Sequence, residues 1–154
     1  MNRKYLVLKA VLAVLAIFAV PARAHDNHDH ASYVAGEPGD AKQPARTIEI
    51  AMNEMVFDPS MIAVRRGEQI RFVLRNDGSQ DHEFLLATTK ENLQHAEMMK
   101  MHPDMVHTDA NGVRLRPKAT AEIVWRFTKA GTFEFACLIP GHREAGMVGR
   151  VTVK

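Results

Sequence analysis

Apolar and polar residues alternate along much of the chain from residue 46 onward, which is the pattern of β-strands that bury one face. In the segment 46–52, Ile48, Ile50 and Met52 share one face, while small and polar residues occupy the other. Similar segments, separated by turn residues, cover 61–65, 69–75, 82–86, 121–127, 132–137 and 148–153. Six or seven short strands at this spacing predict an all-β chain folded as a β-sandwich.

The segment 88–112 departs from this alternation and predicts a short helical insert. It opens with Thr88 and Glu91, which are spaced as in a helix capping box, and continues with good helix formers. Residues three or four apart share a helix face, so several His and Met side chains would form one stripe. Such methionines often fill gaps in a core, but their density beside three histidines favours a labile Cu(I) site. The candidate ligands are His95, Met98, Met99, Met101, His102, Met105 and His107.

The first 24 residues have the features of a secretory signal peptide. Basic residues precede an apolar run over 10–20, and Ala22-Arg23-Ala24 forms a cleavage site. The apolar run is too short to span a bilayer. We therefore expect cleavage after Ala24, export to the periplasm, and no attachment to the membrane afterwards.

Residues 25–45 contain several Gly and Pro residues and few large apolar ones, which predicts a flexible segment. His25, His28 and His30 lie at its start. They belong either to a solvated polar tail or to a second metal site, in which imidazole and terminal amine nitrogens would bind Cu(II).

Removal of the signal peptide changes the charge of the chain. Residues 1–24 hold four of the 20 Lys and Arg residues and none of the 18 Asp and Glu residues, so the mature chain has a net charge of −2. A chain with this charge shows no excess of basic residues that would indicate binding to nucleic acid. We expect a monomer whose partners are copper ions and a redox protein.

The candidate chemistry lies in the segment 137–147, which contains the single cysteine of the chain. Cys137, His142 and Met147 follow one another at equal spacing, and His82 stands at the start of a predicted strand. One thiolate, two imidazoles and one thioether form the ligand set of a type 1 copper centre, with methionine as the weak axial ligand. A lone cysteine is more often a small buried hydrophobe, but an unpaired cysteine in an exported chain needs a reason.

These residues resemble the cupredoxins, which are blue-copper proteins with a Greek-key β-sandwich. The likeness covers residues 46–154, and its spacing of Cys, His and Met is that of rusticyanin and auracyanin. With the His-rich start and the Met-rich insert, the chain is most similar to periplasmic copper-tolerance cupredoxins of the CopI type. The motifs are Phe57-x-Pro59, Val64-x-x-Gly67-Glu68, Asn76 with His82-Glu83-Phe84, and Cys137 with Pro140-Gly141-His142 and Gly146-Met147-x-Gly149.

The resemblance implies one type 1 copper bound by His82, Cys137, His142 and Met147, with the exposed edge of His142 as the exit for the electron. Azurin and plastocyanin carry Asn after the first histidine ligand, whereas this chain has Glu83. We expect Glu83 to contact the copper loop, because metal ligands are normally oriented by a second layer of partners.

Two functions remain open from the sequence. The first is copper tolerance, in which the protein binds excess copper and oxidises Cu(I), and this activity would make it an enzyme. The second is a mobile periplasmic electron carrier with no role in copper handling. The extra His and Met residues favour the first function, because a carrier needs only one copper. No nucleophile–base pair or phosphate-binding loop indicates hydrolysis or group transfer.

Overall fold

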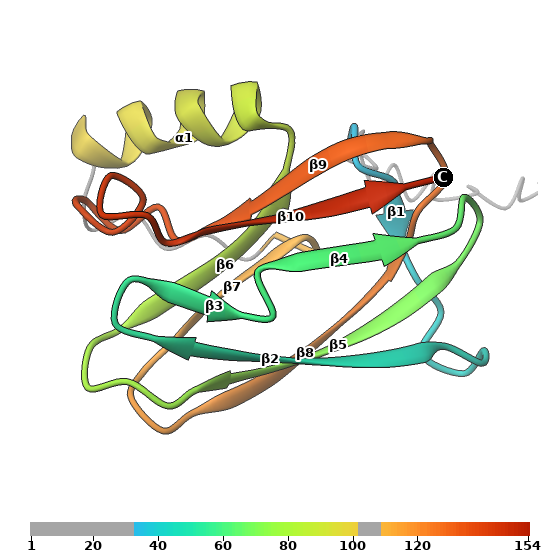
Figure 1. Ribbon diagram of the computed structural model, residues 1–154, viewed down its shortest axis with the longest axis horizontal. Coiled ribbons are helices and arrows are strands. Elements are labelled where there is room, and N and C mark those ends of the chain that lie inside the picture. Colours follow the sequence, from blue (N-terminus) through green and yellow to red (C-terminus); the bar gives the residue numbers. More distant parts are fainter. Residues whose placement is uncertain (1–32, 102–108) are drawn as a thin grey trace, which may run out of the picture. The chain divides into compact units, whose positions relative to one another are not determined.

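The computed structural model of the protein describes residues 33–101 and 109–154, which form two β-sheets and one helix (Figure 1). The predicted signal peptide, His25, His28 and His30 lie outside the described residues, as do His102, Met105 and His107. The elements are β1 (Glu37–Pro38), β2 (Arg46–Asn53), β3 (Val56–Asp58), β4 (Met61–Val64), β5 (Gln69–Asn76), β6 (His82–Ala87), α1 (Thr89–Met101), β7 (Gly112–Leu115), β8 (Thr120–Arg126), β9 (Gly131–Ala136) and β10 (Val148–Val153).

The strands form two five-stranded sheets, so the predicted all-β sandwich is confirmed. One sheet has the order β1-β8-β5-β2-β3, and the other has the order β4-β10-β9-β6-β7. Most neighbours are antiparallel, but β2 pairs with β5 in parallel, and β4 pairs with β10 in parallel. All seven strands predicted from the alternation are present within a residue or two, whereas β1, β3 and β7 were not predicted.

Aromatic side chains fill the space between the two sheets. Phe72 on β5 contacts Phe84 on the opposite sheet at a ring-centroid distance of 5.5 Å, and Phe84 stacks on Phe135 at 5.2 Å. Trp125 on β8 and Phe57 on β3 are also buried in this core. Burial of such large apolar surfaces is the main driving force for folding, and it fixes the ends of β6 and β9, where the candidate ligands lie.

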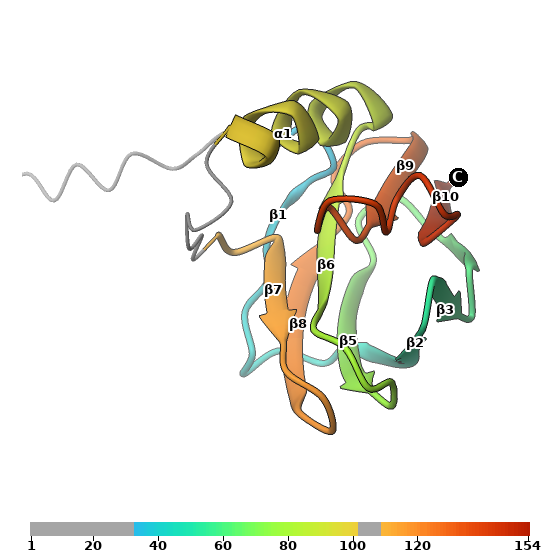
Figure 2. The same cartoon turned by 90° about the vertical axis from the view of Figure 1, so that its left-hand side faces the viewer.

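Helix α1 lies over the outer face of the sheet that contains β6 and β9 (Figures 1 and 2). Its predicted capping box is confirmed: the Glu91 carboxylate accepts hydrogen bonds from the Thr88 N–H and hydroxyl groups, and Thr88 Oγ1 accepts one from the Glu91 N–H. Ala96 packs with Leu85 and Ala136 in a second apolar cluster. All of β6 is therefore buried, covered by the core on one side and by the helix on the other. In the described part of the chain, no helix has the length and apolar character needed to cross a membrane.

Residues 33–45, the described part of the segment 25–45, make specific contacts with the sheet. Tyr33 meets Trp125 edge to face at 5.2 Å, and the Trp125 indole N–H donates to the Ala35 carbonyl at 3.3 Å. Strand β1 pairs with β8, and the Gln69 side chain exchanges hydrogen bonds with the backbone of Asp40. Backbone hydrogen bonds thus order a segment whose composition offers little apolar surface.

Candidate metal centre

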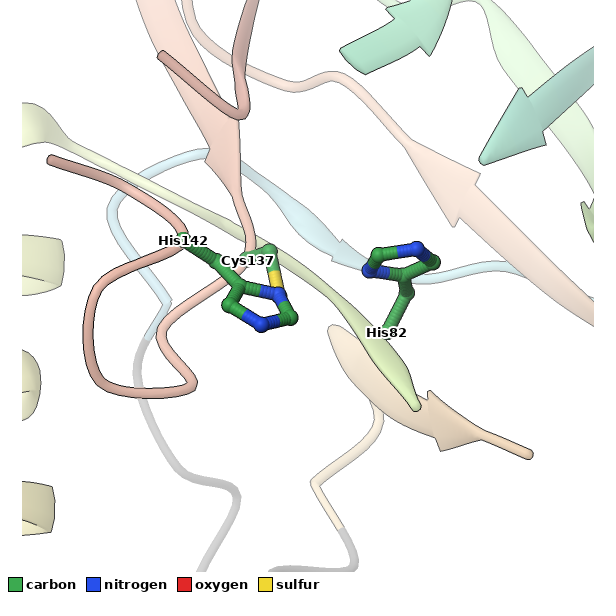
Figure 3. A group of neighbouring side chains, drawn as sticks. All are labelled: His82, Cys137 and His142. Carbon is green, nitrogen blue, oxygen red and sulfur yellow. The ribbon is translucent and has the colours of Figure 1, made fainter. Parts of the chain in front are cut away.

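The structure brings His82, Cys137 and His142 together at one end of the sandwich (Figure 3). Their potential ligand atoms all lie within 4.8 Å of one another, and all three residues are buried. Cys137 Sγ is 3.3 Å from His142 Nδ1, and the ring centroids of His82 and His142 are 5.3 Å apart. The Cys137 sulfur and the His142 nitrogen are therefore close enough for one metal ion to contact both.

The loop between β9 and β10 positions two of these side chains. The Cys137 N–H donates to the Met147 carbonyl at 3.1 Å, and the Met147 N–H donates to the His142 carbonyl at 3.0 Å. Gly141 and Gly146 have φ angles of 91° and 105°, which other residues rarely adopt, so the loop can turn back on itself. Met147 is fully buried in the same core cluster as Cys137, and the closed loop holds all three residues near one another.

Glu83 joins strand β6 to this loop, as the sequence predicted. Its backbone N–H donates to Cys137 Sγ at 3.3 Å, and its carboxylate accepts a hydrogen bond from the Leu138 N–H at 3.2 Å. Glu83 therefore orients the cysteine through both its backbone and its side chain. A carboxylate here also places negative charge beside the sulfur, where azurin and plastocyanin have a neutral amide.

The loop before His82 is held by Asn76 and Glu54. Asn76 is fully buried and donates from its side chain to the Gln80 carbonyl at 2.7 Å and the Leu115 carbonyl at 3.0 Å. Glu54, in the turn between β2 and β3, accepts hydrogen bonds from the N–H and hydroxyl groups of Ser79, and these bonds lower the pKa of Glu54 to about 2. Sequence analysis missed Glu54 because no local signal links a hairpin turn to a loop so far along the chain.

Burial keeps the candidate ligands in their neutral forms when no metal is bound. Desolvation raises the pKa of the Cys137 thiol to about 11. Desolvation also lowers the pKa of His82, with the neighbouring His142 as a second cause, and it lowers the pKa of His142, assisted by Arg114. A bound cation reverses this preference for Cys137, because coordination deprotonates a thiol.

The residues present fit a copper ion. Both ring nitrogens of His82 are buried without a hydrogen-bond partner, which is costly unless an ion or a water satisfies one of them. Two imidazoles and a thiol in a buried pocket form a soft ligand set suited to copper. Met147 is buried in the same core cluster as Cys137, and its thioether would add a further soft ligand to such an ion.

Four of the other predicted ligands lie in the described part of the chain, on α1: His95, Met98, Met99 and Met101. Met98 and Met101 are 41% and 70% exposed, whereas Met99 is buried. His95 lines a cavity of about 180 Å³ between α1, β6 and residues 33–35. His142 is only 7% exposed, so the edge expected to serve as the electron's exit is small, and the neighbouring Pro140 and Gly141 form the surface around it.

Comparison with known proteins defines the class. Residues 45–154 match the family of copper binding proteins described as the plastocyanin/azurin family. The chain belongs to this family, and it is a copper-binding cupredoxin.

Two relatives narrow the class further. The chain is 51% identical over 157 residues to the copper-resistant cuproprotein CopI of Rubrivivax gelatinosus, covering 94% of this chain and 95% of the relative. It is 38% identical over 148 residues to the protein of the same name from Pseudomonas aeruginosa, covering 77% and 82% of the two chains. The expected likeness to proteins of the CopI type is therefore confirmed.

Solved structures support the fold. A dithionite-reduced auracyanin from Roseiflexus castenholzii superimposes with a TM-score of 0.61 at 22% identity, covering 73% of this chain and 99% of that one. Auracyanin A from Chloroflexus aurantiacus gives a TM-score of 0.60 at 21% identity, covering 72% and 100%. At these identities the likeness shows the cupredoxin fold alone.

Proposed function

We propose that the protein binds one type 1 copper through His82, Cys137, His142 and Met147 and serves copper tolerance in the periplasm. The observation that carries the proposal is the buried cluster of one thiol and two imidazoles, closed by the loop that ends at Met147. Copper in such a set cycles between Cu(I) and Cu(II) and so carries single electrons.

The residues around the site would hold its geometry nearly constant between the two oxidation states of copper. The Glu83 N–H holds the sulfur, and the Glu83 carboxylate holds the next backbone N–H. Asn76 and Glu54 fix the loop that precedes His82. A site held in this way needs little rearrangement when an electron arrives or leaves, which favours rapid transfer.

Copper tolerance is favoured over simple electron transport by two facts. Both of the relatives described above are called copper-resistant. In addition, the two thioethers of Met98 and Met101 are exposed on α1, where they can capture cuprous ion without disturbing the core. The His25–His30 tail and the segment that contains His102, Met105 and His107 add further candidate ligands.

Oxidation of Cu(I) follows from the same chemistry. Copper held by His82, Cys137, His142 and Met147 would accept one electron from a substrate cuprous ion, which would leave as Cu(II), and would pass that electron to an acceptor redox protein. The transfer moves no proton. His142 directly follows the exposed Pro140-Gly141 turn, and its edge is the route to the surface that we expect for the electron.

The number of coppers bound distinguishes tolerance from electron transport. The mature chain is titrated separately with Cu(I) and Cu(II), and the bound metal is measured by elemental analysis and EPR. We expect more than one copper, a Cu(I) equivalent lost in a Met98→Leu/Met101→Leu variant, and a Cu(II) equivalent lost when residues 25–30 are removed. Met61→Leu is the matched control, since Met61 is 77% exposed on β4, away from the helix. A single copper in both oxidation states would make the protein an electron carrier.

The type 1 assignment has a separate test. Cys137→Ser should abolish the intense thiolate-to-copper absorption, because Cys137 is the only thiol in the chain. An intense visible band that survives in this variant would refute the assignment.

A further inference from the structure

A buried carboxylate on β9 holds the residue that follows His142. Glu134 is 5% exposed, and its two oxygens accept hydrogen bonds from both nitrogens of one side of the Arg143 guanidinium. The Arg143 Nε and Nη2 atoms lie 3.2 and 3.1 Å from Glu134 Oε1, and Nη2 also lies 3.1 Å from Oε2. This paired arrangement fixes direction as well as distance, which a single contact does not.

Helix α1 completes the surroundings of the same carboxylate. Thr89 Oγ1 donates to Glu134 Oε2 at 3.0 Å, and Asn92 Nδ2 donates to Oε1 at 3.2 Å. The carboxylate thus accepts hydrogen bonds from three side chains on two different segments. A buried group with this many partners has few alternative positions.

The ion pair joins the two ends of the segment 134–143, which contains Cys137 and His142. Strand β9 carries Glu134 three residues before Cys137, and the loop after Cys137 reaches His142 and then Arg143. The backbone links Glu134 to Arg143 through Cys137 and His142, and the ion pair between the two side chains holds the ends of this segment together. His142 therefore has an anchor directly after it, in addition to its own backbone bonds to Ile139 and Met147.

We propose that Glu134 and Arg143 are positioning residues that hold the His142 imidazole in place for the metal. The inference rests on the copper centre proposed above. The pair acts through the loop, because Arg143 sets the course of the backbone that carries the imidazole, and it also ties that loop to helix α1.

The test separates a positional role from a purely electrostatic one. Arg143→Gln removes a positive charge and Glu134→Gln removes a negative charge, so a purely electrostatic effect would move the reduction potential in opposite directions. A positional effect should change the copper EPR splitting and the visible spectrum in the same direction in both variants, and lower Cu(II) affinity by about 10- to 100-fold. Arg143→Lys keeps the charge but not the paired contact. Its EPR splitting, visible spectrum and Cu(II) affinity should therefore lie between those of the wild type and those of Arg143→Gln.

The copper-free protein gives a second measurement that does not depend on copper. The NMR signals of the His142 imidazole should broaden or split in Arg143→Gln, because the ring samples more positions, while the His82 signals stay sharp. The control is Arg71→Gln, which breaks the ion pair between Arg71 and Glu122 on the other sheet and should leave both histidines unchanged. Arg143 is one-fifth exposed, so its variants should fold even if Glu134→Gln does not.

The outcomes are distinct. If wild-type protein gives the thiolate-to-copper band but all three variants match it in spectrum, affinity and His142 NMR, the positioning role is wrong and the copper centre stands. Opposite shifts of potential with an unchanged His142 signal would likewise overturn it in favour of charge alone. If wild-type protein gives no such band, the proposed copper centre itself fails.

Discussion

The buried thiol predicts how the stability of the copper-free protein depends on pH. Burial raises the pKa of Cys137 to about 11 from an ordinary value of 9.0. A raised pKa in the folded state contributes stability that is fully present below pH 9 and is lost as the pH rises toward 11. Two pKa units correspond to roughly 3 kcal/mol of the free energy of unfolding.

The histidines limit stability on the acid side. The pKa values of His82 and His142 are lowered by burial, so the folded state favours their neutral forms. Their contribution to the stability of the folded state is present above the ordinary imidazole pKa of 6.5, and it is lost as the pH falls through their lowered pKa values. The copper-free protein should therefore be most stable between about pH 6.5 and pH 9.

Urea denaturation of the copper-free protein between pH 8 and pH 11 measures the thiol contribution. Over this range the free energy of unfolding of the wild type should fall by roughly 3 kcal/mol more than that of Cys137→Ser, which has no thiol to ionise. Titration of other groups affects both proteins equally and cancels in the difference. Copper binding at pH 8 should release about one proton per ion, because a metal-bound thiol is deprotonated. Identical pH profiles for wild type and Cys137→Ser, or no proton release, would refute the reasoning.

Three further changes test the site and its support. Met147→Leu should keep copper bound and raise the reduction potential in voltammetry, because the thioether stabilises Cu(II); an unchanged potential would mean that Met147 is not axial. Glu83→Gln keeps an acceptor for the Leu138 N–H but removes the charge, so the potential should rise with copper retained, and wild-type values would show that the carboxylate has no influence. Gly149→Ala places a Cβ 2.1 Å from the Phe135 ring and should cost about 1–3 kcal/mol in urea denaturation; a wild-type midpoint would contradict this.

Much of the site could be predicted because its signals are local. Cys137 and His142 share one loop at a fixed spacing, and His82 starts a strand with a clear apolar pattern. The chemistry of these side chains identifies the metal with no knowledge of the fold. The long strands could be predicted for the same reason, since each carries its own alternation.

The supporting contacts could not be predicted, because they join segments far apart in the chain. Glu134 meets Arg143 and the helix only after β9, the loop and α1 have packed together. Glu54, in the turn between β2 and β3, accepts a hydrogen bond from Ser79 in the loop between β5 and β6, and nothing in the sequence around Glu54 indicates this contact. Strand β1 has two residues, too few to show an alternation of apolar and polar positions. It is a strand because its backbone pairs with the edge of β8.

The position of β10 has a consequence for how the metal loop opens. Strand β10 pairs with β9 on one side and, in parallel, with β4 from the first half of the chain on the other. Pairing between such distant segments must first close a long loop, which makes it slow to form. The loop from Cys137 to Met147 therefore reaches its closed form only when β10 has docked. We therefore predict that local release of β10 would open one side of the site while the sheet that contains β2, β5 and β8 stays intact, and that copper exchange would need only this partial unfolding.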